Sequence, residues 1–153
     1  MFVVEDGTDI ILVNYDVLSY WEPRLIGRVR SLVLDESHYI KNGSARRSKV
    51  ALRLSKALLT QEDAMILLLT GTPVVNRPAD IVSQLKMLGR LKSDFGGWFK
   101  FVRRYCQAYR DGFGWHIDGA SNLDELHLKL RSSCYLRRTK EQVLLDLPPM
   151  TWV

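Results

Sequence analysis

Two apolar runs that end in polar turns constrain the fold of this 153-residue chain more than any other feature. Residues 32–34 (Leu-Val-Leu) lead directly into Asp35 and Glu36, and the leucines at 67–69 lead into residues 70–73 (Thr-Gly-Thr-Pro). Such a run is typical of a buried parallel strand that delivers polar side chains to the carboxyl edge of a sheet. One carboxylate there can hold Mg²⁺ through its waters, and the next can orient or activate the water that attacks a γ-phosphate.

Strands and helices alternate along the first part of the chain. Apolar runs predict strands over residues 9–14, 31–35 and 65–70. Apolar residues at helical spacing predict a helix from a cap at Ser44 to about residue 59, and Pro78 suits the first turn of another. This alternation predicts an α/β fold with a parallel sheet.

The character of the chain changes after Gly89. Residues 93–109 are rich in aromatic side chains and are predicted to be helical, while residues 110–119 indicate a loop or hairpin. A helix is expected over 122–132 and a short strand over 134–137. We interpret the aromatic stripe as the core of a small helical insertion, with a base-stacking platform as the alternative.

The composition is typical of a globular protein, at 46% hydrophobic and 25% charged residues. No apolar stretch approaches the roughly 20 residues of a membrane helix, and the N-terminus does not resemble a signal peptide. Cys106 and Cys134 do not form a metal-ligand pair. We therefore expect a protein that is not secreted: nuclear in a eukaryote, or cytoplasmic in a prokaryote or a virus-infected cell.

The net charge of +5 is concentrated in two basic groups. The first contains no acid: Lys41, Arg46, Arg47, Lys49, Arg53 and Lys56. The second lies near the C-terminal end: Lys129, Arg131, Arg137, Arg138 and Lys140. Basic faces attract phosphate backbones by releasing counterions. The alternative for each group is an ordinary solvated helix face.

Several segments together resemble the Swi/Snf-type family of superfamily-two DNA-dependent ATPases. Residues 35–42 (Asp-Glu-Ser-His-Tyr-Ile-Lys-Asn) resemble the family's motif II, and residues 69–78 resemble motif III. Residues 136–149 are similar to the segment that closes the first lobe, and residues 121–126 to the stretch before it in the annealing-helicase branch. The resemblance covers residues 9–149 and implies a partial RecA-like parallel sheet with flanking helices and a small helical protrusion.

The resemblance also implies a division into three parts. Residues 1–90 would form part of the helicase ATP-binding lobe, with motifs II and III. Residues 91–132 would form the helical protrusion, and residues 133–153 the lobe-closing segment.

Catalytic roles follow from the same resemblance. Asp35 would contact Mg²⁺ through water, Glu36 would be the catalytic base, and His38 would couple the ATP site to Thr70 and the DNA-facing loops. Three residues after the second apolar run would relay the state of the γ-phosphate: Thr70, Gly71 and Thr72. Gly71 is expected where the backbone turns tightly or is approached closely.

Loops beside the cleft between lobes would contact double-stranded or forked DNA, through phosphates rather than bases. The candidates are Asn14, Tyr15, Lys41, Asn42, Asn76, Arg77, Arg137, Arg138 and Lys140. The last three could instead brace the two lobes against each other.

The 153 residues contain no Gly-x-x-x-x-Gly-Lys-Ser/Thr run, the loop that holds ATP phosphates. Gly112-x-Gly114 is followed by Trp115-His116 and is not such a loop. In the family, the P-loop precedes the segment seen here at 9–14 and a second lobe with an arginine finger follows. We therefore expect an incomplete lobe, inactive alone, whose sheet exposes apolar faces or backbone edges, so that the chain is marginally stable or self-associates.

Other functions stay open at this stage. The chain could be a non-enzymatic nucleic-acid-binding module, or a fragment that completes a split ATPase with a partner carrying the P-loop. Another superfamily-two branch or the motor subunit of a restriction system is the alternative within the enzyme class.

Overall fold

The structure is a computed structural model that describes residues 7–71, 77–138 and 142. The chain forms two compact units, residues 1–123 and 124–153. Among the described helices, none is long and apolar enough to cross a membrane.

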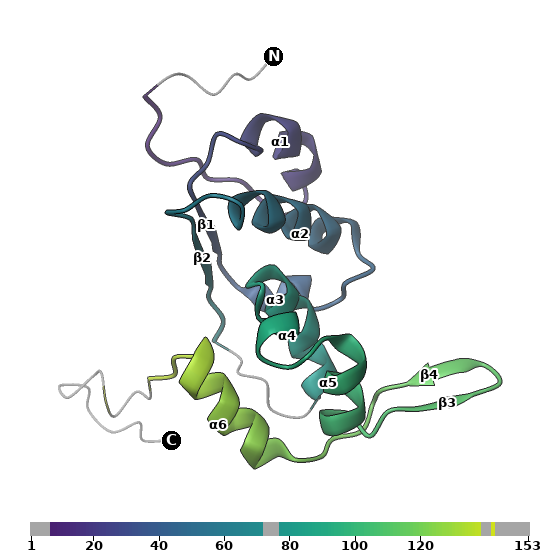
Figure 1. Cartoon of the computed structure of the whole chain (residues 1–153). Coiled ribbons are helices and arrows are strands. Elements are labelled where there is room, and N and C mark those ends of the chain that lie inside the picture. The colour runs from purple at the N-terminus through teal and green to yellow at the C-terminus, as the bar shows by residue number, and fades with distance from the viewer. Residues whose placement is uncertain (1–6, 72–76, 139–141, 143–153) are drawn as a thin grey trace, which may run out of the picture. The chain divides into compact units, whose positions relative to one another are not determined.

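A strand–helix–strand unit forms the centre of the first part (Figure 1). β1 (Ser31–Leu34) is followed by α2 (Arg46–Leu58) and then by β2 (Met65–Leu68). The two strands are parallel, in a register that pairs Ser31 with Met65 and Leu34 with Leu68. The predicted α/β fold class and its parallel sheet are therefore confirmed.

The predicted strand at residues 9–14 is wrong, because no strand is assigned there. Within the described residues, β1 and β2 form a two-stranded sheet without a third member. Ile11 and Val13 pack against the core, whereas Ile10 and Leu12 are exposed. The apolar run predicts a buried strand, but only alternate residues in it are partly buried, and a strand also needs a hydrogen-bonded neighbour, which the local sequence does not reveal.

Helix α2 carries the core of this unit. Val50, Leu54 and Leu58 follow helical spacing and are buried. Ala45, rather than the predicted Ser44, occupies the N-cap position. The reason is that the Ser44 hydroxyl donates to the side chain of Asn42 in the preceding turn.

Helix α1 (Leu18–Leu25) packs beside α2, and an ion pair joins them. Arg53 on α2 contacts Glu22 on α1, with Nη2 2.7 Å from Oε2. This hydrogen bond lowers the pKa of the Glu22 carboxyl. The side chain of Glu22 is only 13% exposed, so Arg53 compensates a carboxylate that is largely removed from water.

Four short helical segments follow the sheet. They are η2 (Pro78–Ile81), α3 (Val82–Met87), α4 (Arg90–Ser93) and α5 (Trp98–Tyr105). The prediction that Pro78 starts a helical turn is confirmed, since it occupies the first turn of η2.

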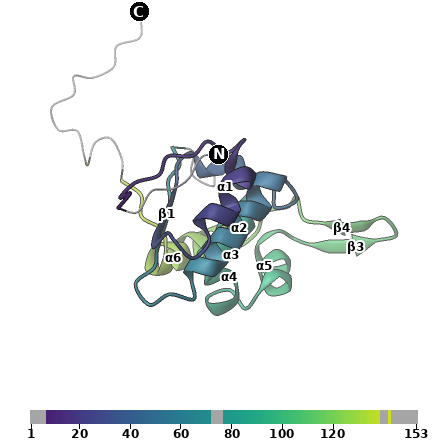
Figure 2. The same cartoon turned by 90° about the horizontal axis from the view of Figure 1, so that it is seen from above.

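The predicted helix over 93–109 is shorter in the structure. Gly96 and Gly97 have left-handed φ values of 69° and 96°, which interrupt the chain before α5. A Cβ on Gly96 would also lie 2.6 Å from Cδ of Lys100. After α5, β3 (Tyr109–Asp111) and β4 (Gly114–His116) form an antiparallel hairpin, as the sequence indicated (Figure 2).

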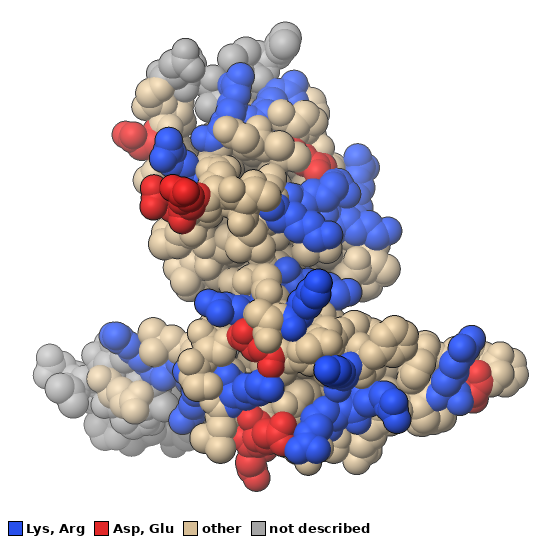
Figure 3. All heavy atoms as spheres, in the orientation of Figure 1, with Lys and Arg blue, Asp and Glu red and all other residues tan. Residues whose placement is uncertain are grey.

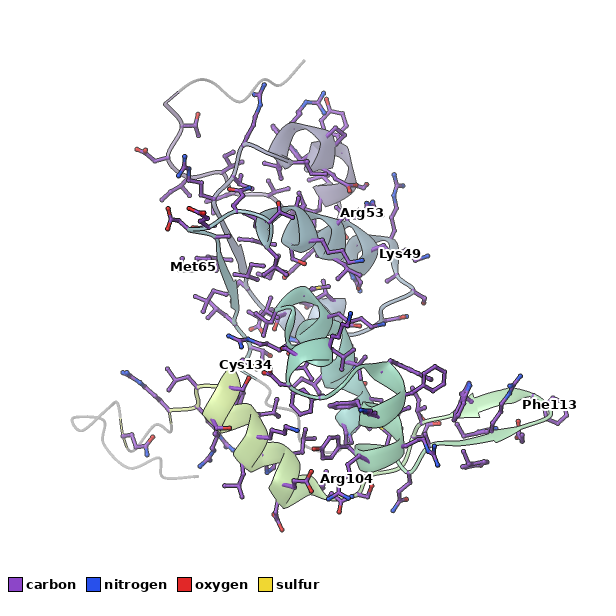
Figure 4. All side chains as sticks on the ribbon, viewed as in Figure 1. Lys49, Arg53, Met65, Arg104, Phe113 and Cys134 are labelled. Carbon is purple, nitrogen blue, oxygen red and sulfur yellow. The ribbon has the colours of Figure 1, made fainter. Side chains whose placement is uncertain are left out.

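One face of the parallel sheet is open and apolar. Val33, Met65, Leu67 and Leu69 are each 41–51% exposed. The surface over the middle of this side of the strands is tan in Figure 3, and Met65 points away from α2 in Figure 4. The expected exposure of an apolar sheet face is confirmed.

In the second unit, α6 (Leu123–Ser133) confirms the predicted helix over 122–132. The predicted strand at 134–137 is wrong. The backbone N–H groups of Cys134 and Tyr135 both donate to the Leu130 carbonyl, so the chain leaves α6 through a helical turn. The division of the chain at residues 90 and 132 stays a prediction.

Candidate functional site

The acidic pair lies where the two parallel strands end. Past β1 and β2 the backbones stay joined, because the Leu69 N–H donates to the Leu34 carbonyl at 2.9 Å and the Ser37 N–H donates to the Leu69 carbonyl at 2.7 Å. Asp35 and Glu36 therefore lie between two residues whose backbones are hydrogen-bonded to Leu69. Their side chains are exposed at the carboxyl edge of the sheet.

A tight turn fixes the direction of the acidic pair. Asp35 Oδ1 accepts from the Glu36 N–H at 2.9 Å, and Glu36 has the left-handed values φ 45° and ψ 50°. Helix η1 (Ser37–Ile40) begins at the next residue. A non-glycine residue in this conformation costs about 1–3 kcal/mol and persists only where the surroundings enforce it, often at functional sites.

His38 lies beside Glu36, as expected for a shared site. Its Nδ1 is 3.1 Å from Glu36 Oε2, without the alignment of a hydrogen bond. The imidazole also packs on Tyr39, with ring centroids 4.4 Å apart. The structure thus brings together the three predicted catalytic residues: Asp35, Glu36 and His38.

Tyr15 stabilises the acidic turn through a hydrogen bond to its backbone. Its hydroxyl donates to the Asp35 carbonyl at 2.7 Å. Burial, and then the negative charge of Asp35, raise the pKa of Tyr15 to about 12. The phenol therefore stays protonated at neutral pH and keeps its role as a donor.

Tyr39 and Arg47 complete this support, and the sequence did not suggest this role for either residue. The Arg47 Nε donates to the Tyr39 carbonyl at 2.8 Å, and its guanidinium lies 5.7 Å from the centre of the Tyr39 ring. The Tyr15 ring lies 6.3 Å from the Tyr39 ring. Tyr39 stood within the recognised motif, but no local signal could show that Arg47 folds back onto it.

The expected γ-phosphate relay begins directly after β2. Thr70 is half-buried and Gly71 is exposed. Among the described residues, a Cβ on Gly71 would meet nothing within 4 Å and its φ is not left-handed, so the tight turn and close backbone approach there stay a prediction. Three predicted site residues lie outside the described part of the chain: Thr72, Asn76 and Lys140.

Lys41 and Asn42 lie just beyond η1 and take part in internal contacts. The Lys41 Nζ is 3.4 Å from Asp80 Oδ2, and its carbonyl accepts from the Ser83 hydroxyl at 2.9 Å. Asn42 Oδ1 accepts from both the N–H and the hydroxyl of Ser44. Asn42 therefore builds the turn before α2 as well as being a candidate DNA contact.

The remaining candidates are exposed. Asn14 Oδ1 accepts from the Asp16 N–H at 3.1 Å and so shapes the turn before α1. Arg77 precedes η2, and Arg137 and Arg138 follow α6 in the second unit. Their positions leave them accessible, while their roles stay predictions.

Basic side chains gather over α2 (Figure 3). Along its solvent face lie Arg46, Lys49, Arg53 and Lys56. Their spacing of three or four residues places them in one stripe, and Figure 4 labels Lys49 and Arg53 on it. Arg53 is engaged by Glu22, so the other three carry the charge available to a partner.

Comparison with known protein families and proteins identifies the family of the chain. The family model of the SNF2-related domain matches residues 3–152. The chain belongs to the SNF2-related domain family. The resemblance to the Swi/Snf-type family is thereby confirmed, and the parallel sheet with its flanking helices is a partial RecA-like fold of that family.

Its relatives are much longer proteins. The DNA annealing helicase and endonuclease ZRANB3 is 36% identical over 152 residues in Mus musculus and 42% identical over 164 residues in Bos taurus. The SWI/SNF-related matrix-associated actin-dependent regulator of chromatin subfamily A-like protein 1 of Xenopus tropicalis is 35% identical over 139 residues. These matches cover 94%, 96% and 91% of this chain, which spans 14% of each relative. No solved structure gave a significant match.

Proposed function

We propose that this SNF2-related domain is part of an ATP-driven motor that moves along double-stranded or forked DNA and remodels or anneals it. The observation that carries the proposal is the Asp35–Glu36 turn at the carboxyl edge of parallel strands, in a chain matched to this family over residues 3–152. The names of the relatives, a DNA annealing helicase and a regulator of chromatin, support DNA as the substrate.

Asp35 suits a Mg²⁺ ion that keeps most of its waters. No three acidic, histidine or cysteine side chains cluster as a metal site in the described residues. Mg²⁺ on ATP needs only one or two carboxylates besides phosphate oxygens, so the exposed carboxylate of Asp35 fits this role. When bound, the Mg²⁺–ATP complex supplies the phosphoryl group and neutralises its charge.

Glu36 would then orient the attacking water and accept its proton. Its left-handed backbone conformation and its position between two backbone hydrogen bonds fix the point from which the Glu36 side chain extends. His38, 3.1 Å from Glu36 Oε2, would restrict the carboxylate to one side. The proximity of the three groups would position Glu36 as a general base for catalysis.

The same backbone bonds offer a route for coupling. The Ser37 N–H donates to the Leu69 carbonyl, and Thr70 is the next residue. A displacement of residues 70–72 would therefore act directly on the turn that holds Asp35 and Glu36. We propose that this link relays the state of the γ-phosphate to the loops that face DNA.

DNA would be held through its phosphates. Lys41, Arg77 and the α2 stripe present donors on the surface. Asn14 and Tyr15 would act chiefly by shaping turns, because their polar atoms already bond within the chain. Asn42, Asn76, Arg137, Arg138 and Lys140 remain proposed contacts, the last three with bracing of the lobes as the alternative.

ATP phosphates would need a cradle that these 153 residues do not contain. The Gly112-x-Gly114 run forms the turn of the β3–β4 hairpin. We propose that the P-loop and the arginine finger come from another part of the same protein or from a partner chain. On its own, the 153-residue chain would then hydrolyse almost no ATP.

Hydrolysis with and without duplex or forked DNA tests this reading. The 153-residue chain is expected to give turnover at background and to bind duplex DNA with an affinity that falls steeply with salt. If DNA stimulates turnover and Glu36→Gln abolishes it, the proposal that the lobe is incomplete would be wrong. The proposed role of Glu36 would be supported. Glu62→Gln is the matched control, because Glu62 is an exposed acid that lies just before β2 begins.

A binding module without catalysis is the second candidate, favoured by the stripe on α2. Under that reading, Glu36→Gln leaves every DNA-dependent function of the protein unchanged, while Lys49→Gln and Lys56→Gln weaken duplex binding. Each lost phosphate contact should reduce the salt slope by about 0.9. A split ATPase predicts instead that activity appears when a chain carrying the P-loop is added.

A further inference from the structure

We propose that the β3–β4 hairpin and the exposed face of α5 form a site that stacks unpaired bases of single-stranded DNA. The inference rests on the proposed function only in taking DNA as the partner. It concerns a surface that is separate from the acidic edge of the sheet and is contained entirely in the first unit.

Three aromatic rings form a cluster on this surface. Trp98 and Phe99 begin α5, and Trp115 lies on β4. The centroid of Trp115 is 5.8 Å from Trp98 and 5.6 Å from Phe99, both in edge-to-face contact. Phe99 is nevertheless 60% exposed and Trp115 is 40% exposed. The rings hold one another in place while leaving surface free for a further flat partner.

The core does not need these three rings. Phe95, Phe101 and Tyr105 fill it instead and are at most 5% exposed. Their centroids lie 5.1–6.0 Å apart. The aromatic stripe of the sequence is thus divided into a buried set and a solvent-facing set. The buried set confirms the core interpretation, and the exposed set revives the alternative of a stacking platform.

A fourth ring stands at the tip of the hairpin. Phe113 is fully exposed, and Figure 4 shows it at the far end of the β3–β4 turn. Asp111 Oδ1 accepts from the N–H groups of Phe113 at 2.8 Å and Gly114 at 3.0 Å. The turn therefore presents an apolar ring to water from a backbone that is held in one conformation.

Unpaired cations flank the exposed rings. Arg110 lies directly across the hairpin from Trp115, and Arg103 lies one helical turn after Phe99. Neither arginine, nor the exposed Lys100, has an ion-pair partner among the described residues. Asp111 is instead engaged by His116, with Nε2 2.6 Å from Oδ2. Positive charge beside exposed rings is the combination that binds single strands.

The arrangement favours unpaired bases over duplex DNA or a protein. In a duplex the faces of the bases are covered by their neighbours, so only the arginines could contribute. A protein interface needs a broad surface, about 800 Å² on each side, whereas this site offers a small cluster of three rings and a fourth ring at the hairpin tip, flanked by cations. Each ring that stacks on a base contributes about 1–3 kcal/mol, equivalent to about 5- to 150-fold in affinity.

Fluorescence anisotropy of the 153-residue chain with three labelled probes tests the site. The probes are a single strand, an abasic strand of the same length and the matching duplex. We expect the wild type to bind the abasic strand at least about fivefold more weakly than the normal strand. Phe99→Ala and Phe113→Ala should each weaken binding of the normal strand by about fivefold or more, and leave duplex binding within about twofold.

Tyr20→Ala is the matched control, because Tyr20 is a half-exposed aromatic residue on α1. It should leave all three affinities unchanged. The comparison of normal and abasic strands uses the wild type and does not depend on how a variant folds. Circular dichroism and the thermal midpoint verify the folding of each variant.

Two failures can be told apart. Equal binding of normal and abasic strands, or single-strand binding that the phenylalanine substitutions leave intact, would overturn the stacking site while duplex binding still supported the motor. Loss of duplex binding in the wild type would instead count against the proposed function. A wild type that binds no single strand would also refute the stacking site.

Discussion

The acidic edge of the parallel sheet and the aromatic hairpin differ in which groups they turn to solvent. At the edge, the charged side chains of Asp35 and Glu36 are exposed, next to a core that contains Leu34 and Leu54. At the hairpin and the adjoining face of α5, Phe113 and Phe99 expose apolar rings, and charge lies at their sides. Both regions use a tight turn with an aspartate that accepts from the following backbone N–H groups.

The difference shows how each region is kept in place. Backbone bonds between neighbouring strands hold the acidic pair, so its geometry depends on the sheet. Contacts between rings hold the hairpin against α5, so its geometry depends on side-chain packing. A group that acts on a phosphate must be positioned closely, whereas a ring that stacks on bases tolerates different sequences.

The largest expected effect separates the two sets of aromatic rings on α5. Phe101→Ala should lower the free energy of unfolding by about 3–5 kcal/mol, because this ring is fully buried. Phe99→Ala on the same helix should cost less than about 1 kcal/mol, since Phe99 is 60% exposed. Urea unfolding measures both changes. Equal losses would mean that the two sets do not differ in their contribution to the core.

The next effect concerns the open face of the sheet beneath the acidic edge. Self-association through this face would bury the exposed half of Met65 and of Leu67, and each would contribute about half of the roughly 1.5–3 kcal/mol of a fully buried side chain. Replacing both by Gln should therefore weaken association by about tenfold or more, as measured by sedimentation velocity.

Leu12→Gln is the control for this prediction, because Leu12 is a highly exposed leucine outside the sheet. It should leave the association constant unchanged. A wild type that stays monomeric at every concentration would show that the exposed apolar face does not drive self-association.

A smaller effect tests the support of the acidic turn. Tyr15→Phe removes the hydrogen bond to the Asp35 carbonyl and should cost about 1 kcal/mol near neutral pH. The folded-state pKa of about 12 lies above the ordinary value of 10. The contribution of Tyr15 is therefore complete below about pH 10 and is lost as the pH rises through about 12.

Urea unfolding of both proteins across this alkaline range measures the difference. The gap between wild type and Tyr15→Phe should close between about pH 10 and 12. Tyr20→Phe is the control, because the Tyr20 hydroxyl accepts from Arg24 Nη2 at 3.4 Å and, among the described residues, does not bond to the acidic turn. It should show no such closing gap. A gap that stays constant with pH would contradict the role of the Tyr15 proton.

Local signals predicted most of the elements that position the site. The apolar runs identified β1 and β2, helical spacing identified α2, and the Gly-rich aromatic stretch indicated the hairpin. Each of these signals is contained within one segment of chain. The grouping of Asp35, Glu36 and His38 followed from the end of a single strand.

Features that depend on distant segments could not be predicted in this way. A strand at 9–14 needs a bonded neighbour, and the contact of Arg47 with Tyr39 needs α2 to fold back over η1. The division of the aromatic stripe depends on which side of α5 meets the core. Periodicity shows that one side is buried, but the rings at the ends of a short helix can be assigned to either set.

The smallest expected effect lies in the hairpin turn and sharpens the comparison of the two aspartates. Backbone N–H groups of Phe113 and Gly114, together with His116, lower the pKa of Asp111. Its contribution to the turn is therefore present above the ordinary aspartate value of about 4 and is lost as the pH falls through the lowered value. Asp111→Ala should speed amide hydrogen exchange at Phe113 and Gly114 while leaving the overall thermal midpoint nearly unchanged. Asp111→Asn keeps an acceptor oxygen but not the charge, so it should retain part of the protection and lose its acid dependence. Exchange in Asp111→Ala that matches the wild type would mean that the rings around Trp115, rather than the aspartate, hold the tip.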